Sequence, residues 1–367
     1  MNILLCSPYT GLGGISQWTN NILNYHNSTN DDNLITPFYP DISAYNLAPT
    51  GGSIRRIIRG LKMYLPFVQQ FNKEISKRQY TTVHISTSGS LSLIRDLLCL
   101  RKAKKRGIKT CLHFHFGRLP QIFETGGWEK QLLIKCLSYT DVPIAIDKPS
   151  YETLLKAGSN SVVYLPNPLS QDVERIINEN RCQKEKGLIV FVGHLVKPKG
   201  VYELVSACKE IRKIRKIRLK LIGPYEEDVK KDLIDLAGER YDEWLEIAGK
   251  CDQETALKEM LRSELFILPS YSEGFPNVIL ESMACGCTII TTGVGAIPEM
   301  LNFSGEKCGI LIKVQDDNDI KEKILEYLAF PENYRKMPDN AYKRVREEYN
   351  INKIYSSLLN IWNNGRF

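Results

Sequence analysis

The sequence lacks several features that define other classes of protein. No apolar run approaches the roughly 20 residues that a membrane-spanning helix needs. The 10 cysteines occur without a Cys-x2-Cys pair or a repeated spacing, which indicates reduced thiols in a cytosolic protein. The opening segment MNILLCSPYTG lacks the basic and long apolar regions of a signal peptide, so we expect a first strand there. We therefore expect a cytoplasmic protein, free or peripheral on the inner face of the plasma membrane.

The composition indicates a two-domain globular protein with uneven charge. At 367 residues the chain exceeds one ordinary hydrophobic core, and its 43% apolar and 25% charged residues are typical of folded proteins. Residues 1–167 carry 19 lysines and arginines against 10 acidic residues, a net charge of +9. The remaining residues carry 30 against 32, a net charge of −2. A basic first half favours an acidic neighbour, such as anionic lipid, a pyrophosphate-bearing acceptor or nucleic acid.

The stretch 264–299 carries the clearest chemical signal. It begins with an apolar run of strand length, Leu265–Pro269, and continues through the loop Glu273-Gly274-Phe275-Pro276-Asn277 into a helix. Pro276 suits the first turn of a helix, and the free backbone N–H groups of Gly274 to Val278 suit phosphate or sugar oxygens. A second strand, Thr288–Thr291, completes the unit. Its loop is therefore expected at the carboxyl edge of a parallel sheet, where such sheets bind ligands.

Two carboxylates eight residues apart, Glu273 and Glu281, can each accept hydrogen bonds from a polyol. This spacing, within the segment PSYSEGFPNVILESMACG, resembles the donor loop of the retaining nucleotide-sugar glycosyltransferases of family four, within the group 1 glycosyltransferases. The resemblance implies that Glu273 lies beside the transferred sugar and that Glu281 holds the ribose hydroxyls. It also implies donor contacts from Gly274, Phe275, Pro276, Asn277 and Val278.

The resemblance extends to other turns of the second half. The turn Gly193-His194 to Lys199-Gly200 resembles the family's diphosphate-binding turn, and Lys199 matches its lysine. His194 stands where the family has arginine, so diphosphate affinity is expected to depend more on Lys199, because a neutral imidazole carries no fixed charge. The loops at Gly223 and Lys250, together with Leu257, are implied to flank the nucleotide base. We expect no metal, since Asp316–Asp319 occupies a helix-cap position and is interpreted as a cap.

The first half supplies the acceptor-side candidates. The turn with Gly13 and Gly14 fails as a dinucleotide fingerprint because Ser16 replaces the third glycine, but it resembles the family's glycine loop near the donor phosphates. Strand alternation sends His113 and His115 to one side, near the carboxyl edge. The resemblance favours His115 as the histidine next to the reacting sugar, with His113 as the alternate or a core residue.

Residues 53–78 alternate basic and apolar residues at helical spacing. Ile54, Ile57, Ile58, Leu61 and Leu65 are expected to share one face, with Arg55, Arg56, Arg59 and Lys62 on the other. This pattern is typical of a helix on a membrane surface, and equally of an ordinary surface helix on the sheet.

Taken together, these features predict an α/β protein with two Rossmann-like domains facing across a cleft, the GT-B fold. The predicted domains are residues 1–168, which bind the acceptor, residues 169–345, which bind the nucleotide sugar, and a helix at 346–367 that returns to the first domain. The resemblance implies metal-independent, retaining transfer from a UDP- or GDP-sugar to a glycan or lipid-linked saccharide in bacterial surface polysaccharide synthesis, without a cofactor and without nucleic acid as a partner. A nucleotide-sugar epimerase of the same fold and a non-catalytic glycan-binding protein are the alternatives.

Overall fold

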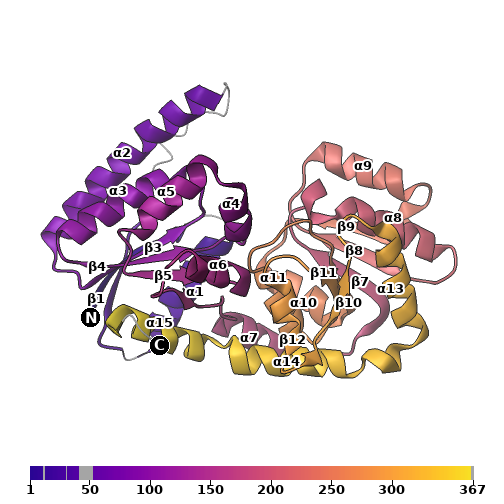
Figure 1. Ribbon diagram of the computed structural model, residues 1–367. Coiled ribbons are helices and arrows are strands. Elements are labelled where there is room, and N and C mark those ends of the chain that lie inside the picture. Colours follow the sequence, from indigo (N-terminus) through magenta and orange to yellow (C-terminus); the bar gives the residue numbers. More distant parts are fainter. Residues whose placement is uncertain (11–12, 30, 41–52, 365–367) are drawn as a thin grey trace. The chain divides into compact units, whose positions relative to one another are not determined.

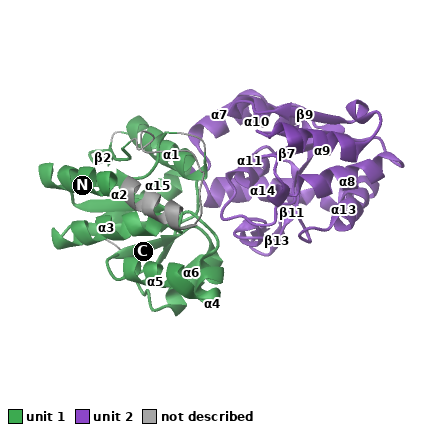
Figure 2. Ribbon diagram, turned by 90° about the horizontal axis from the view of Figure 1, so that it is seen from above, with its two compact units in different colours: residues 1–168, 351–367 green, residues 169–350 purple. Residues whose placement is uncertain are grey.

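The computed structural model describes residues 1–10, 13–29, 31–40 and 53–364, and of residues 53–63 and 364 it describes only the backbone. The chain forms two compact units (Figure 2). Unit 1 comprises residues 1–168 and 351–367, and unit 2 comprises residues 169–350. The chain passes from unit 1 to unit 2 between residues 168 and 169 and returns between residues 350 and 351.

Unit 1 alternates strands and helices, as the sequence predicts. Its described elements are β1 (Asn2–Cys6), α1 (Gly14–Ser28), β2 (Leu34–Pro37), α2 (Ser53–Lys77), β3 (Thr82–Thr87), α3 (Ser92–Lys105), β4 (Lys109–Phe114), α4 (Leu119–Thr125), α5 (Gly127–Leu137), β5 (Val142–Ala145), α6 (Lys148–Lys156), β6 (Val163–Tyr164) and α15 (Ile351–Asn364). The six strands pair in parallel in the order β2-β1-β3-β4-β5-β6. The chain therefore reverses its direction of winding between β1 and β3.

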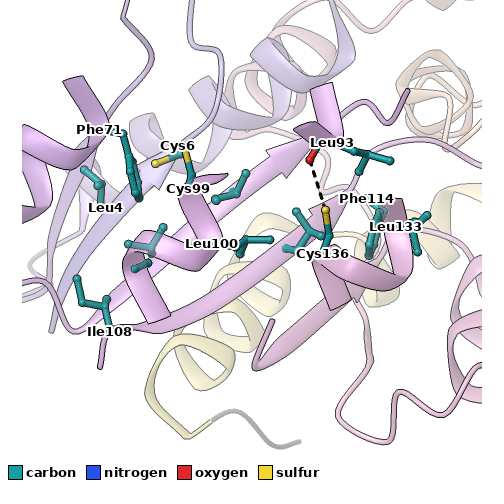
Figure 3. Packing of buried hydrophobic residues seen from close by; sticks show 14 of the residues in the cluster. Leu4, Cys6, Phe71, Leu93, Cys99, Leu100, Ile108, Phe114, Leu133 and Cys136 are labelled. Atoms are coloured by element: carbon teal, nitrogen blue, oxygen red, sulfur yellow. Dashed lines mark hydrogen bonds between the residues drawn. The ribbon is translucent and has the colours of Figure 1, made fainter. Parts of the chain in front are cut away.

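Helices cover both faces of this sheet (Figure 1). On one face α2, α3 and α5 bury a cluster that includes Leu4, Phe71, Leu93, Leu100 and Phe114 (Figure 3). On the other face α1 and α15 bury a second cluster around Trp18, Leu358 and Trp362. Each strand alternates its side chains between these two covered faces, so nearly every residue of β1, β3 and β4 is buried, polar ones included.

Helix α2 differs from its predicted packing. Leu65 was expected on the buried face, but its side chain is 55% exposed, whereas Phe67, Val68, Phe71 and Ile75 are buried. The apolar stripe that reaches the core is therefore the one after Pro66, within the helix. The basic and apolar side chains of residues 53–63 lie outside the described residues, so the membrane-surface hypothesis stays a prediction. Among the helices described, each is too short or too polar to cross a bilayer.

Unit 2 repeats the same plan. Its described elements are α7 (Gln171–Glu179), β7 (Glu185–Val192), α8 (Val201–Arg212), β8 (Arg218–Ile222), α9 (Glu227–Ala237), β9 (Leu245–Gly249), α10 (Gln253–Arg262), β10 (Ser263–Leu268), α11 (Asn277–Ala284), β11 (Thr288–Thr292), α12 (Ile297–Met300), β12 (Asn302–Phe303), β13 (Glu306–Lys307), β14 (Ile310–Ile312), α13 (Asp317–Ala329) and α14 (Lys336–Glu348), with short 3-10 turns at Lys197–Lys199, Tyr241–Glu243 and Pro331–Tyr334. Six strands form a parallel sheet in the order β14-β11-β10-β7-β8-β9, and β12 and β13 form a small antiparallel pair.

Ser170 caps α7, which buries Val173 and Ile177. The predicted helix at the end of the chain corresponds to α15, which starts at Ile351, after α14 has ended at Glu348. The side chain of Asp316 accepts a hydrogen bond from the N–H of Asp319, at 2.9 Å, which confirms that it caps α13. The predicted pair of parallel α/β units is likewise confirmed.

Candidate functional site

The strand order of unit 2 reverses its direction between β7 and β10. From β7 the chain winds through β8 to β9, and it then returns to β10 on the other side of β7 before continuing to β11. Parallel sheets bind ligands at such reversals, at the carboxyl ends of the strands. The loops that follow β7 and β10 both lie at this position. They contain the residues that the sequence singled out, Lys199 and Glu273.

Close backbone contacts hold the loops at this edge together. The Tyr271 N–H donates to the Pro198 carbonyl oxygen at 2.9 Å, which joins the loops after β10 and β7. Gly200 adopts a left-handed conformation (φ 71°), and a Cβ there would lie 2.1 Å from the Pro269 carbonyl oxygen. A Cβ on Gly223 would similarly lie 1.9 Å from the carbonyl oxygen of Gly193. Both positions require glycine, because any side chain would separate the loops.

Lys199 and Glu273 form an ion pair where the strand order reverses, between the loops that follow β7 and β10. The Lys199 Nζ donates to Glu273 Oε1 at 2.6 Å, and the two side chains are 31% and 11% exposed. The pair fixes one cation and one carboxylate side by side, at the reversal of the sheet. A charge-assisted hydrogen bond of this length is among the stronger polar contacts in proteins. The lysine keeps enough exposed surface to contact a bound anion.

Glu281 is a nearly buried carboxylate on α11. Its side chain is 9% exposed, and the Gln253 Nε2 donates to its Oε1 at 2.6 Å. Gln253 begins α10, which the Asp252 side chain caps by accepting from the Thr255 N–H at 2.7 Å. Burial of a carboxylate is costly unless hydrogen bonds satisfy it, so this position favours a ligand or partner that donates hydrogen bonds.

The other predicted donor residues differ in accessibility. His194 and Lys250 are exposed, Gly193 is partly exposed, and Leu257 is fully buried in the core of unit 2. Phe275 is also buried, 6% exposed, with its ring 5.7 Å from that of Tyr349. The side chains of Leu257 and Phe275 thus pack in the core, and each can act on a ligand only by shaping the backbone around it.

The start of α11 agrees with the sequence in part. Asn277 is its first residue and Pro276 lies directly before it, so the proline precedes the helix rather than standing in its first turn. The Gly274 carbonyl oxygen accepts from the Ala296 N–H at 2.8 Å, which anchors the loop to the segment after β11. Val278 is half-buried, whereas Ile279 and Met283 have no exposed surface.

In unit 1 the two candidate histidines belong to a larger aromatic cluster. The imidazole centroids of His113 and His115 lie 3.9 Å apart, and Trp18 contacts both at 4.9 and 5.0 Å. His84 lies 5.3 Å from His113, and its Nδ1 accepts a hydrogen bond from the Trp362 indole N–H at 3.1 Å. Although three imidazoles meet here, no group of histidine, cysteine, aspartate or glutamate in the described part of the chain is arranged to hold a metal ion.

Burial keeps these imidazoles neutral. Desolvation lowers the pKa of His84 and of His115 to about 3, and it holds the pKa of His113 well below its ordinary value. His113 has no exposed surface, while His115 keeps part of its surface exposed just after β4. Neither ring nitrogen of His115 has a hydrogen-bond partner among the described residues. Both ring nitrogens of His113 are likewise without a partner, and the nitrogens of both rings are buried, so the exposed surface of His115 comes from its other atoms.

Gly13 and Gly14 lie at the start of α1, which begins at Gly14. Both glycines are exposed, and a Cβ on either would meet no atom within 4 Å. The Gly13 carbonyl oxygen accepts the first hydrogen bond of the helix, from the Gln17 N–H. The turn therefore leaves open space at the carboxyl edge of β1.

The sequence did not reveal His84, Trp18, Trp362 or Gln253. The parallel register that pairs His84 with Cys111 and Ser86 with His113 brings His84 and His113 to one face, and a single strand pattern does not show that pairing. Trp362 arrives from α15, 278 residues after His84 in the chain. Gln253 carried no signal, since glutamine at a helix start is common on surfaces.

The sequence of the chain is similar to those of known proteins. Residues 172–344, within unit 2, match the family described as "Glycosyl transferases group 1". An uncharacterized 41.2 kDa protein in the cps region of Klebsiella pneumoniae is 26% identical over 88% of each chain. The capsular polysaccharide biosynthesis glycosyltransferase CapM of Staphylococcus aureus is 31% identical over 54% of this chain and 50% of its own length. Residues 172–344 are thus similar in sequence to the group 1 glycosyltransferases.

A solved structure shows the same fold. The crystal structure of Anabaena Alr3699/HepE in complex with UDP superposes with a TM-score of 0.72, at 14% sequence identity, and covers 98% of each chain. The two parallel-sheet units are thus those of the GT-B architecture.

Proposed function

We propose that this protein transfers a sugar, with retention of anomeric configuration, from a nucleotide-diphosphate sugar to a glycan or lipid-linked saccharide acceptor. The donor is a UDP- or GDP-sugar, and the product belongs to a bacterial surface polysaccharide. CapM, whose name states capsular polysaccharide biosynthesis, and the cps-region protein of Klebsiella support this setting. The ion pair between Lys199 and Glu273 at the sheet reversal of unit 2 is the observation that carries the proposal.

The two members of this pair suit the two ends of a nucleotide sugar. Departure of the nucleotide leaves negative charge on its diphosphate, and a nearby cation stabilises that charge in the transition state. Lys199 supplies the cation. As the diphosphate binds Lys199, the carboxylate of Glu273 becomes available to accept hydrogen bonds from the sugar hydroxyls. We infer that transfer needs no metal, since Lys199 and the first N–H groups of α11 provide positive charge.

Retention follows from an attack on the same face from which the nucleotide departs. In this scheme the departing phosphate oxygen takes the proton of the acceptor hydroxyl as the new glycosidic bond forms. Glu273 then orients and stabilises the sugar and forms no covalent bond to it, so we assign no nucleophile. His115, as a neutral hydrogen-bond donor, is proposed to contact a sugar hydroxyl.

Glu281 is proposed to hold the ribose diol through two charge-assisted hydrogen bonds. Each such bond contributes about 1.5–3 kcal/mol. The variant Glu281→Ala should therefore weaken binding of the nucleotide diphosphate at least tenfold, as measured by calorimetry with UDP and with GDP. Glu243→Ala is the matched control, because Glu243 precedes β9 at the opposite edge of the sheet and is half exposed. Unchanged affinity in Glu281→Ala would reject the assignment.

A screen of nucleotide sugars would test the activity itself. Hydrolysis of one UDP- or GDP-sugar, together with thermal stabilisation by the matching nucleotide, is the expected result. Stabilisation by none of them would overturn the proposed function.

A further inference from the structure

Two neighbouring loops at the carboxyl edge of the unit 1 sheet are fastened to each other. Residues 88–91 follow β3, and residues 115–118 follow β4 and lead into α4. The His115 N–H donates to the carbonyl oxygen of Thr87, the last residue of β3, at 3.1 Å. This bond continues the pairing of the two strands by one residue, so it fixes the place where the second loop begins.

An ion pair fixes the other end of the second loop. Arg118, its last residue, donates to Glu129 of α5 through both terminal nitrogens, Nη1 to Oε2 at 2.9 Å and Nη2 to Oε1 at 2.7 Å. Arg118 Nη2 also donates to the Ser90 hydroxyl oxygen at 2.8 Å, and the Ser90 N–H donates to Glu129 Oε1 at 2.7 Å. A bidentate pair of this kind fixes orientation as well as distance. Ser90, Arg118 and Glu129 form one network, which we call the Arg118 network, and it joins three segments of unit 1.

The backbone at Ser90 is held in a conformation that serine rarely adopts. Its φ of 53° lies in the left-handed region, which is unfavourable for a residue with a Cβ. Gly89, the residue before it, has a φ of 78°, and a Cβ there would lie 2.8 Å from Phe116 Cζ. Such backbone strain persists only where the surrounding contacts enforce it, and it is concentrated at functional sites. Here the contacts that enforce it come from Arg118 and Glu129.

His115 lies close to the Arg118 network in the chain. Only Phe116 and Gly117 separate it from Arg118. The Arg118 guanidinium carbon lies 5.1 Å from the centroid of the Phe116 ring, so the network also contacts the residue next to His115. Neither ring nitrogen of His115 has a hydrogen-bond partner among the described residues. Since no such bond orients the imidazole, its direction depends on the packing of neighbouring rings and on the path of the loop backbone.

We propose that Arg118 and Glu129 are positioning residues, which hold the loop of residues 115–118 so that His115 can contact the reacting sugar. Neither of the two side chains touches that sugar itself. This inference rests on the proposed function, because the contact between His115 and the sugar belongs to that function. A catalytic group that is displaced by about 1 Å can lose on the order of a hundredfold in rate, so the attachment of this loop has a measurable effect on turnover.

The first measurement follows the His115 imidazole in the full chain without substrate. The chain contains 5 histidines, so protein labelled with nitrogen-15 only at histidine gives few imidazole NMR signals, and His115→Ala identifies those of residue 115. Arg118→Ala and Glu129→Gln should shift or broaden these signals. Arg101→Ala should leave them unchanged. It is the matched control, because Arg101 of α3 is exposed and also lies over an aromatic ring, that of Tyr139, at 5.6 Å.

The second measurement separates positioning from general stability. Turnover is the release of UDP or GDP from UDP-glucose, UDP-galactose, UDP-N-acetylglucosamine or GDP-mannose. Arg118→Ala should lower turnover about tenfold or more, and Glu129→Gln about three- to tenfold. The affinity for UDP or GDP should not change, because Lys199 and Glu281 lie in unit 2.

The same two changes are then made in the His115→Ala background. There they should have no further effect on turnover, since they act through a residue that is already removed. Residues that merely stabilise the fold would lower turnover equally in both backgrounds.

Unchanged His115 signals in both Arg118→Ala and Glu129→Gln would overturn the proposal. Losses of turnover that combine in full with the loss in His115→Ala would overturn it too, and so would full turnover in His115→Ala. If Arg118→Ala fails to fold, judged by circular dichroism, Glu129→Gln decides both measurements. If the unaltered chain releases no nucleotide from any of the four sugars, the proposed function fails instead, and the imidazole signals alone decide whether the Arg118 network positions His115.

Discussion

The neutral imidazole of His84 makes the stability of unit 1 depend on pH. This side chain has no exposed surface, and burial lowers its pKa to about 3, against an ordinary value of 6.5. Between these two pH values the unfolded chain binds a proton that the folded unit does not. The free energy of unfolding therefore falls as the pH falls through this range, by about 2 kcal/mol from this one residue between pH 7.5 and pH 5.

The variant His84→Phe removes the contribution of residue 84 to the pH dependence of stability. It also lowers the free energy of unfolding by an amount that is the same at every pH. At pH 7.5 it leaves the Trp362 indole N–H without its acceptor, which should lower the free energy of unfolding by about 1–3 kcal/mol. At pH 5 about 2 kcal/mol of that difference should disappear, because only the unaltered protein takes up a proton at residue 84 on unfolding, while His113 and His115 contribute to both proteins. The two stability curves should therefore converge toward acid pH.

Urea unfolding followed by tryptophan emission measures this effect. In a Trp244→Phe background the remaining buried tryptophans are Trp18 and Trp362, both in unit 1. The control is Val83→Ala, a truncation on the same strand that destabilises the core without removing a titrating group. Its curve should run parallel to that of the unaltered protein. If the His84→Phe curve is also parallel, the imidazole does not change protonation on unfolding and the reasoning is refuted.

Two further predictions concern catalysis. His115→Ala and Glu273→Ala should each lower turnover while leaving nucleotide diphosphate affinity nearly intact, whereas Lys199→Ala should damage both, because the diphosphate contacts Lys199 before and after transfer. Full turnover in His115→Ala with loss in His113→Ala would show that His113 is the acting histidine, and full turnover in both would remove the histidines from the reaction. Transfer should also persist in excess chelator, and loss that manganese restores would reject metal independence.

The donor half of the site could be predicted from the sequence because its signal is local. Three elements follow one another directly in the sequence: the strand at Leu265, the loop at Glu273 and the strand at Thr288. In the structure β10, α11 and β11 have nearly the predicted bounds.

The features that sequence reasoning missed depend on contacts between distant segments. The aromatic cluster of unit 1 joins β3, β4, α1 and α15, and no periodicity along one segment reports it. Leu65 was predicted on the apolar face because one continuous apolar stripe was assumed along the helix. Pro66 lies within α2, and the buried apolar residues come after it, whereas Leu65 before it is exposed. The burial of Leu257 likewise depends on what packs over α10.

The return of the chain to unit 1 affects the order in which the two units can fold during synthesis. Leu358, Ile361 and Trp362 of α15 are buried in the same core as Trp18, so this face of unit 1 is incomplete without them. During synthesis, residues 1–168 leave the ribosome first, but all of unit 2 must be translated before α15 appears. At about 5–20 residues per second this delay is on the order of ten seconds or more. During this delay, residues 1–168 of the nascent chain have one apolar face uncovered. Unit 2, a single uninterrupted segment, can complete its own core before α15 is available.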